Sequence, residues 1–264
     1  MPELCEVQIM TDNLHRWMVG TTIIKTEVVD FRLDSVSSIA METVKAVYRR
    51  AKYSVVQFES HSIILHYRMT GQVVKESLVH ETRFVRMRWI LNSGEQVAFV
   101  DPRKFGTIDI VLNTELDDWW VNKGLGAEIW PMDRNGEWWS TVMSGVKTAI
   151  KPALLKQDRV VGIGNILASE FCFAASISPF VPTNTITLRQ WNTFAKTSRE
   201  RIVAILEEEQ NEKIGFLHEG AKNPNAFKVY GREGEQCSQC ETRITKCQQS
   251  GRATYFCSVC QSVQ

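Results

Sequence analysis

Long apolar runs are missing from this sequence. Apolar stretches such as residues 62–65 and 160–163 fall far short of the roughly 20 residues that a helix needs to cross a bilayer. The first residues, Met-Pro-Glu-Leu-Cys-Glu, also lack a basic segment leading into an apolar one, so no secretory signal is expected. We therefore expect a protein without membrane contact inside the cell, in the cytoplasm and nucleoid if bacterial and in the nucleus if eukaryotic.

The sequence also lacks an excess of basic over acidic residues, or the reverse. The 31 Lys and Arg residues are balanced by 30 Asp and Glu residues, which gives a formal net charge of +1. Nucleic-acid-binding proteins usually carry surplus basic residues that displace counterions from phosphates, so composition alone does not indicate DNA. The basic residues nevertheless cluster, while acidic residues gather near 207–212. A positive face and a solvated charge mixture are both compatible with this distribution.

Cysteine is present in a distinctive pattern. Cys237 and Cys240 form one Cys-x-x-Cys pair and Cys257 and Cys260 form another, with sixteen residues between the pairs. This is the spacing of a tetrahedral site with four thiolate ligands, and nothing indicates the oxidising compartment that disulfides would need. The sequence therefore predicts one structural zinc ion. No chemical role is predicted for the remaining three cysteines, which are Cys5, Cys172 and Cys247.

Hydrophobic periodicity predicts a β-rich first half. Apolar residues recur at helical spacing from residue 4 to about 18, which predicts a helix directly after Glu3. From about 22 to 112 the pattern has period two, as at 85–91, where apolar and basic residues alternate. Further β-rich runs cover 54–59, 62–69, 96–100 and 107–112. We expect an antiparallel β-sandwich or barrel, within an α+β protein.

The second half has a helical pattern and ends in the cysteine pairs. Residues 117–139, rich in Trp, Asp and helix-breaking residues, are assigned to the region between domains. Helices are expected near 137–149, 152–157, 165–175 and 187–209. The predicted domains are an N-terminal β-sandwich domain at 1–130, a helical domain at 131–226 and a zinc ribbon at 227–264.

Three segments contain distinctive motifs. They read Met-Pro-Glu-Leu-Cys-Glu-Val at 1–7, Asp-Pro-Arg-Lys-Phe-Gly at 101–106 and Val-Gly-Ile-Gly-Asn-Ile-Leu-Ala-Ser-Glu at 161–170. These motifs resemble those of the formamidopyrimidine-DNA glycosylase and endonuclease VIII family. Their order, together with the cysteine ribbon, extends the resemblance over essentially the whole chain, closer to the formamidopyrimidine branch. It implies a monomeric base-excision repair enzyme that removes 8-oxoguanine and formamidopyrimidines from double-stranded DNA. The same enzyme would cleave abasic sites by β,δ-elimination.

The resemblance assigns the bond-breaking chemistry to Pro2. Once Met1 is removed, a terminal proline has a secondary amine that can attack a sugar carbon and form a Schiff base. At a reference pKa of about 7.7–8.0, roughly a tenth to a fifth of such an amine is neutral at pH 7. Glu3 is the implied acid–base group and Glu6 a supporting residue. Both would also be favourable simply as acids at a helix N-terminus.

The resemblance also implies residues that hold DNA. Lys52 would belong to the catalytic site and approach the phosphate of the damaged nucleotide. A helix–two-turn–helix motif would bind phosphate through the backbone at Gly164 and the amide of Asn165. Lys151 would be a further DNA contact, and Arg252, at the tip of the ribbon, would grip a distorted phosphate pair. Without the resemblance, the lysines would be taken for ordinary surface residues.

Three residues match the positions that fill the void left by an extruded nucleotide. Rotating a base out of the stack costs a few kcal/mol and leaves a hole beside the orphaned partner. Phe105 could wedge between bases, Arg103 could hydrogen-bond an orphaned cytosine, and Met69 would complete the set. Each residue alone would more often belong to a core or a plain surface.

Two departures from the family pattern keep alternatives open. Position 5 is Cys where the family usually has Pro, and the 215–226 loop is short for one that caps a flipped purine. The short loop leaves room for an endonuclease VIII-like preference for oxidised pyrimidines or hydantoins. A non-catalytic damaged-DNA-binding protein that retains Met1 is a second alternative, and a zinc-ribbon nucleic-acid adaptor is a weaker third.

Overall fold

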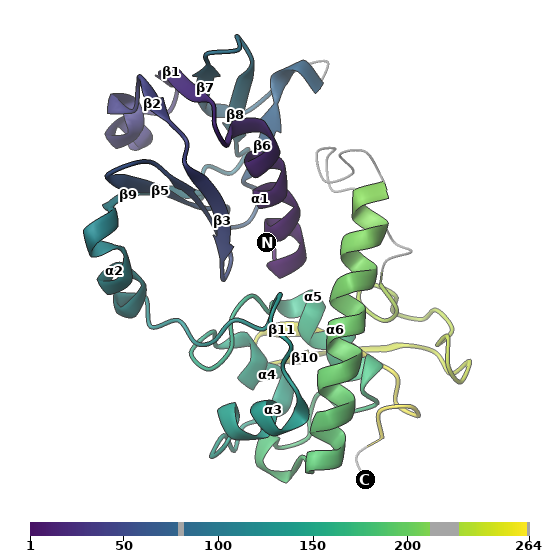
Figure 1. Cartoon of the computed structure of the whole chain (residues 1–264). Coiled ribbons are helices and arrows are strands. Elements are labelled where there is room, and N and C mark those ends of the chain that lie inside the picture. Colours follow the sequence, from purple (N-terminus) through teal and green to yellow (C-terminus); the bar gives the residue numbers. More distant parts are fainter. Residues whose placement is uncertain (79–81, 212–226, 263–264) are drawn as a thin grey trace. The chain divides into compact units, whose positions relative to one another are not determined.

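The computed structural model describes residues 1–78, 82–211 and 227–262, which form two separately packed units, Met1–Gly124 and Leu125–Gln264 (Figure 1). The 215–226 loop lies outside the described residues. Within the described ranges, no helix combines the length and the hydropathy needed to span a membrane.

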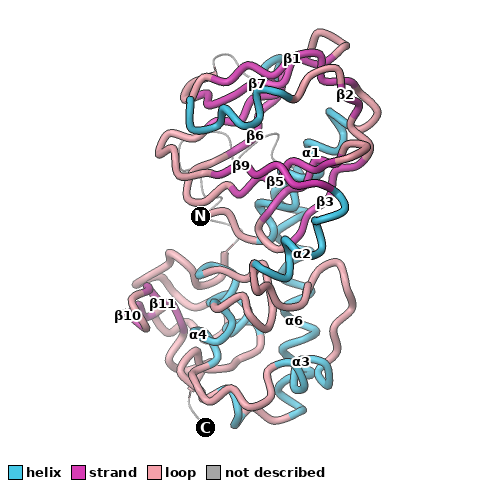
Figure 2. Tube along the Cα trace, turned by 90° about the vertical axis from the view of Figure 1, so that its left-hand side faces the viewer, coloured by secondary structure: helices cyan, strands magenta, loops and turns pink. Residues whose placement is uncertain are grey.

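Two antiparallel sheets make up most of the first unit (Figure 2). The five-stranded sheet has the order β2-β1-β7-β8-β6, with β1 at Thr22–Val28, β2 at Glu42–Thr43, β6 at Gln72–Lys75, β7 at Val85–Leu91 and β8 at Gln96–Val100. The four-stranded sheet has the order β3-β4-β5-β9, with β3 at Ala46–Arg50, β4 at Tyr53–Gln57, β5 at His61–His66 and β9 at Thr107–Leu112. The antiparallel sheets and the α+β class are confirmed. Short 3₁₀ segments are η1 Phe31–Ser38, η2 Glu76–Leu78, η3 Asn113–Glu115 and η4 Thr183–Thr185.

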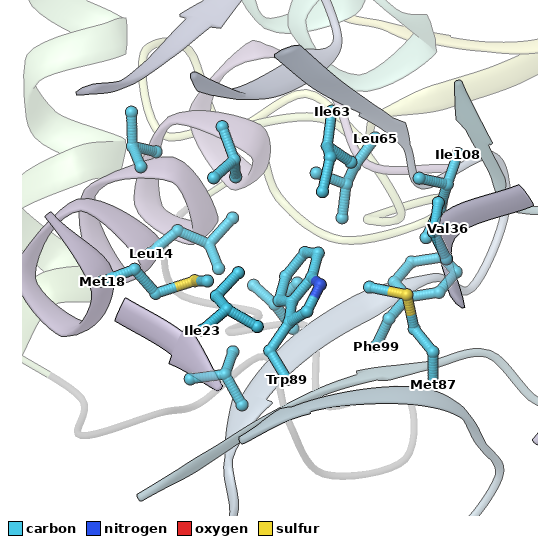
Figure 3. Close-up of a cluster of buried hydrophobic side chains, with 14 of the residues drawn as sticks. Leu14, Met18, Ile23, Val36, Ile63, Leu65, Met87, Trp89, Phe99 and Ile108 are labelled. Carbon is cyan, nitrogen blue, oxygen red and sulfur yellow. The ribbon is translucent and has the colours of Figure 1, made fainter. Parts of the chain in front are cut away.

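Helix α1, Leu4–Met18, shares one apolar core with strands of both sheets (Figure 3). Its buried residues Val7, Met10, Leu14 and Met18 recur every three or four positions, so the helix buries a single stripe. Trp89 of β7 is fully buried in the same cluster. The helix predicted from the apolar spacing is therefore confirmed, and its burial anchors the amino terminus.

A buried chain of hydroxyl groups fixes α1 against strand β4. Thr11 donates to the carbonyl of Val7 and lies 2.6 Å from the Ser54 hydroxyl, which accepts a 2.7 Å hydrogen bond from Tyr67. Because buried hydroxyls are costly without partners, the pairing constrains how α1 lies on the strand.

Residues 117–139 contain a helix that the sequence pattern did not indicate. Helix α2 spans Leu116–Asn122. Leu116, with the partly buried Trp119 and Trp120, packs on Ile64 and Val111 of the four-stranded sheet. Packing on the sheet stabilises this short helix, which could not persist alone.

Helices dominate the second unit, as predicted, and their bounds are α3 Gly136–Val142, α4 Ile150–Leu155, α5 Asn165–Ala174 and α6 Leu188–Asn211. Trp139 stacks on Trp191, with ring centroids 6.1 Å apart, and Phe194 meets both rings edge-on. The carboxyl-terminal hairpin joins β10 Thr245–Gln249 to β11 Arg252–Phe256. Its two turn residues, Ser250 and Gly251, both have positive φ, 49° and 74°, as in a type I′ turn.

Glu170 of α5 fastens the segment that leads into the cysteine ribbon. The carboxylate is fully buried and accepts hydrogen bonds of 2.9 Å from the backbone N–H groups of Lys228, Val229 and Tyr230. Arg201 of α6 pairs with the same carboxylate at 3.2 Å. One buried charge therefore joins α5, α6 and the start of the ribbon.

Glu170→Gln should lower the free energy of unfolding by about 2–4 kcal/mol, because an amide cannot accept all of these bonds and leaves Arg201 without its ion pair. Urea unfolding followed by circular dichroism measures the loss. Glu200→Gln is the matched control, since that α6 carboxylate is 61% exposed. Equal unfolding midpoints for the two variants would refute the role given to Glu170.

Candidate functional site

The first turn of α1 holds the amino terminus in place. Glu3 is the N-cap residue, is only 5% exposed, and forms a reciprocal capping box with Glu6. The Glu3 backbone N–H donates to the Glu6 carboxylate, and the Glu6 backbone N–H donates to the Glu3 carboxylate. Pro2 directly precedes this box and is partly buried. Its nitrogen is in the amide bond to the exposed Met1, so a free proline amine requires removal of Met1.

Glu6 has a proton affinity suited to neutral pH. Burial and the neighbouring Glu3 carboxylate raise the pKa of Glu6 to about 7. The hydrogen bond from Glu3, the terminal amino group and Lys52 act in the opposite direction. The first turn of α1 therefore contains a carboxyl group able to take up or release a proton near pH 7.

Lys52 lies in the turn between β3 and β4, close enough to Glu6 to influence that carboxyl group. The lysine is 7% exposed. Arg49 supports the turn, because its guanidinium donates to the carbonyl of Ala51 at 2.7 Å and to the Gln8 side chain of α1 at 2.9 Å. Glu3, Glu6 and Lys52 are thus brought together beside Pro2, from segments some 50 residues apart.

His66, which the sequence analysis did not single out, lies in the same region. It ends β5 and is 8% exposed, and its Nδ1 accepts a 3.1 Å hydrogen bond from the Arg68 backbone. Burial, followed by the charges of Arg68, Lys52 and Lys123, lowers the pKa of His66 to about 4. The neutral ring therefore carries its proton on Nε2 and can donate to an acceptor. His66 precedes Met69 by three residues, and this closeness to a predicted void-filling residue is the sequence feature that could have identified it.

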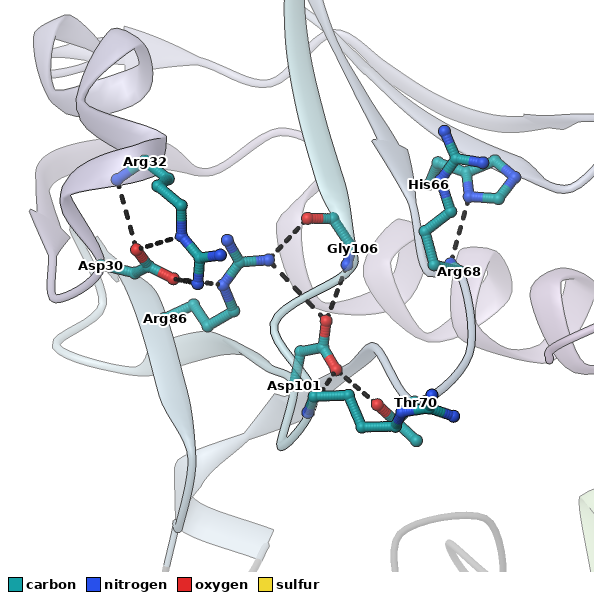
Figure 4. A network of polar contacts seen from close by, with 9 residues as sticks. Asp30, Arg32, His66, Arg68, Thr70, Arg86, Asp101 and Gly106 are labelled. Carbon is teal, nitrogen blue, oxygen red and sulfur yellow. Dashed lines mark hydrogen bonds and ion pairs between the residues drawn. The ribbon is translucent and has the colours of Figure 1, made fainter.

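Asp101 ties together the two loops that carry Met69, Arg103 and Phe105 (Figure 4). The fully buried carboxylate accepts hydrogen bonds from the Thr70 hydroxyl at 2.5 Å and the Gly106 backbone at 2.7 Å. Met69 and Phe105 remain 44% and 53% exposed. The Arg103 guanidinium lies 4.7 Å above the Phe105 ring. The three predicted void-filling residues therefore project from loops that share one anchor.

Arg86 compensates the buried charge of Asp101. The arginine is 2% exposed and pairs with Asp30 at 2.9 Å and with Asp101 at 3.7 Å. It also donates to the Gly106 carbonyl at 2.5 Å. Hydrogen bonds from Arg32, and to a smaller extent from Arg86, hold the pKa of Asp30 well below its usual value. The sequence motif contained Asp101 and Gly106, but Thr70 and Arg86 lie in other segments, and their contacts with Asp101 were not predicted.

Lys151 and Asn165 form a second polar centre, in the other unit. Lys151 of α4 is 1% exposed, and its ammonium donates to the Asn165 side-chain oxygen at 2.7 Å, the Thr254 hydroxyl at 2.8 Å and the Ala253 carbonyl at 3.1 Å. Asn165 donates one amide proton to the same carbonyl at 2.9 Å. These bonds give Lys151 a positioning role between α4, α5 and β11, and its direct contact with DNA stays a prediction.

The phosphate-binding candidates near this centre occupy two turns. Gly164 is the N-cap of α5, in extended backbone, and Asn165 is the first residue of that helix. Arg252 follows the Ser250–Gly251 turn at the tip of the hairpin and is exposed. The hydrogen bonds of Lys151 and Asn165 to Ala253 place the hairpin beside the start of α5.

The four predicted metal ligands converge at the base of the ribbon. All Sγ atoms of Cys237, Cys240, Cys257 and Cys260 lie within 4.8 Å of one another. Two of the separations are 3.8 Å and 3.4 Å. A tetrahedron with metal–sulfur bonds of about 2.3 Å has edges of about 3.8 Å, so the thiols fit a four-coordinate ion. The other cysteines lie outside this cluster.

Two family models match the chain. One, described as the formamidopyrimidine-DNA glycosylase N-terminal domain, matches residues 1–108, and the other, described as the formamidopyrimidine-DNA glycosylase H2TH domain, matches residues 125–214. The curated formamidopyrimidine-DNA glycosylase of Escherichia coli O7:K1 is 33% identical over 272 residues, which cover 99% of this chain and 100% of that protein.

Solved structures agree with these matches. A variant of the Lactococcus lactis FPG in complex with a Fapy-dG containing DNA has a TM-score of 0.88 and 27% identity, with 99% of this chain and 100% of that chain covered. The wild-type Lactococcus lactis protein in complex with an oxidised pyrimidine containing DNA has a TM-score of 0.86 at the same identity and coverage.

The raised pKa of Glu6 predicts how stability changes with pH. Folding raises this pKa from 4.5 to about 7, so the group stabilises the folded state below pH 4.5 and loses that contribution as the pH rises through 7. Wild type and Glu6→Gln should therefore be similarly stable at pH 4.5, and Glu6→Gln should be the more stable at pH 8. Urea unfolding at both pH values measures this, with Glu59→Gln, at an 85% exposed carboxylate, as control. A difference that does not change with pH would contradict the shift.

Proposed function

The chain belongs to the formamidopyrimidine-DNA glycosylase family, and from this premise we propose how its own residues carry out the reaction. It is a base-excision repair glycosylase and abasic-site lyase that acts on oxidised bases in DNA. The observation that carries the mechanistic proposal is the capping box of Glu3 and Glu6, which fixes the turn directly after Pro2 and lies within electrostatic reach of Lys52.

The amine of Pro2, freed by removal of Met1, is the nucleophile. Its nitrogen forms a bond to C1′ of the damaged nucleotide while the bond from C1′ to the base breaks and the base takes up a proton. Opening of the sugar ring places a proton on O4′ and gives an iminium between Pro2 and C1′. The iminium makes the C2′ hydrogen acidic, so successive β- and δ-eliminations release the 3′ and 5′ phosphates.

Glu3 supplies and removes protons in these steps. It is the carboxyl group nearest to Pro2 in the sequence and is nearly buried, as a group that protonates O4′ should be. Glu6 supports it, since a carboxyl group with a pKa of about 7 keeps the pair from carrying two full negative charges at neutral pH. Glu6 acts through Glu3 and the backbone and is a positioning residue.

Lys52 and His66 bind the phosphate of the damaged nucleotide. Lys52 provides a compact positive charge, and His66 provides a neutral Nε2 donor. In the second unit, phosphate contacts come from the Gly164 backbone, the second amide proton of Asn165 and the guanidinium of Arg252. Lys151 orients Asn165 and the hairpin.

The four clustered cysteines hold one structural zinc ion. Their sulfur separations fit tetrahedral coordination, and four protein ligands leave no open position for water. The ion therefore supplies no catalytic chemistry. Its role is to shape the base of the hairpin that presents Arg252.

The substrate range includes formamidopyrimidines, 8-oxoguanine and some oxidised pyrimidines. Relatives bound to Fapy-dG DNA and to oxidised pyrimidine DNA support this breadth. The experiment is single-turnover excision from duplexes that carry each lesion, with an undamaged duplex as control. Excision of at least one oxidised base with 3′ and 5′ phosphate ends is expected. Damage-specific binding without excision would favour the non-catalytic alternative.

Loss of zinc should weaken DNA binding without unfolding the first unit, because the ion organises only the ribbon. Cys257→Ser should show the same loss, whereas Arg252→Ala should lose binding and keep the metal. Fluorescence anisotropy with a damaged duplex and metal analysis together measure both effects. Active protein with clearly less than one zinc per chain would exclude this assignment.

If Arg103 reads an orphaned cytosine, lesions opposite C should be excised faster than the same lesions opposite A. A good base contact contributes about 1–3 kcal/mol, which corresponds to roughly 5- to 150-fold discrimination. Arg103→Ala should flatten the ratio of single-turnover rates on C- and A-paired duplexes. An unchanged ratio in this variant would rule out base reading by Arg103.

A further inference from the structure

Arg68 has a backbone conformation that residues with a Cβ atom rarely adopt. It lies in the turn after β5 with φ of +53°, in the left-handed region that favours glycine. Its backbone N–H donates to His66, and its exposed side chain makes no hydrogen bond or ion pair with any residue in the described ranges. A strained turn that presents an uncompensated guanidinium is typical of a functional position.

Lys123 is a second exposed cation of the same unit. It follows α2 directly, and its ammonium lies 4.2 Å from the centre of the Trp119 ring, with no acidic partner among the described residues. The Trp119 ring in turn meets Tyr53, and Tyr53 contacts His66, with ring centroids 5.9 Å and 4.5 Å apart. Lys123 and Arg68 therefore belong to one group of side chains arranged around His66.

The electrostatics of His66 support this placement independently. After burial, the charges that lower the pKa of His66 are those of Arg68, Lys52 and Lys123, in that order. Three cations thus lie close enough to act on one imidazole. Asp109 acts on Tyr53, and Asp117 and Asp118 lie in α2, but none of these carboxyl groups forms an ion pair with Arg68 or Lys123 in the described ranges. Such a concentration of positive charge is costly unless an anion binds there.

We propose that Arg68 and Lys123 form an additional phosphate site of the N-terminal unit, which binds the DNA backbone next to the phosphate held by Lys52 and His66. The proposal rests on the proposed function, because it extends the DNA contact assigned there. Arg68 suits this role, since its planar guanidinium can engage two phosphate oxygens. Lys123, held by the Trp119 ring, adds a point charge.

The site predicts a specific salt dependence of DNA binding. Each phosphate contact contributes about 0.9 to the slope of log K against log salt concentration. Arg68→Ala and Lys123→Ala should each lower the slope by about 1, and the double variant by about 2, irrespective of base sequence. At fixed salt, each single variant should bind about fivefold more weakly. Lys25→Ala removes the same charge from an exposed ion pair with Glu27 and should leave the slope unchanged.

The measurement is fluorescence anisotropy with a duplex containing one tetrahydrofuran abasic analogue, over a series of NaCl concentrations at pH 8, where His66 is neutral. Arg68→Gly adds a second readout. It should bind DNA as weakly as Arg68→Ala but melt about 2–4 °C higher than wild type, because glycine relieves the strained φ.

Three outcomes separate this inference from the proposed function. Lower slopes for both alanine variants support the site. Unchanged slopes for either variant, while wild type binds the duplex normally, overturn it and leave the proposed function intact. Failure of wild type to prefer the abasic duplex over undamaged DNA would instead overturn the proposed function.

Discussion

The reciprocal hydrogen bonds between Glu3 and Glu6 determine where the first residues of the chain lie. They close the first turn of α1, and the apolar stripe of that helix and the Thr11–Ser54 contact fix it on the core. Two carboxyl groups in one buried turn repel each other, and this repulsion, with burial, raises the pKa of Glu6. Lys52 offsets part of the cost. The arrangement that fixes the turn after Pro2 is thus also the one that raises the pKa of Glu6.

Buried charged groups also hold other segments of the chain together. Asp101 joins two loops, Glu170 fastens the entry to the ribbon, and Lys151 links α4 and α5 to the hairpin. Each charged group is almost fully buried, and each is satisfied largely by backbone or hydroxyl partners. A loop tied in this way can present Phe105, Arg252 or Asn165 in a fixed position without contributing to a core. Irregular backbone is thereby held in a defined conformation.

Local sequence signals predicted helix α1, most strands and the cysteine cluster, because each has a short-range cause such as periodicity or ligand spacing. Other features depend on partners far away in the chain. Helix α2 exists through packing on the four-stranded sheet, Arg86 pairs with Asp30 across 56 positions, and Lys151 bonds Thr254 across 103. The special environment of His66 likewise arises only when separate turns meet. No spacing rule in a single sequence encodes such pairings.

Peptide mapping of a borohydride-reduced complex between the enzyme and lesion DNA tests the central claim most directly. Reduction converts an iminium into a stable bond between the attacking nitrogen and C1′, so mass spectrometry can identify the modified residue. The account predicts that the adduct lies on the amino-terminal peptide, at Pro2 with Met1 removed, and that Pro2→Gly or a retained amino-terminal extension abolishes it. An adduct on Lys52 or another lysine, or trapping by a protein with a blocked amino terminus, would contradict it.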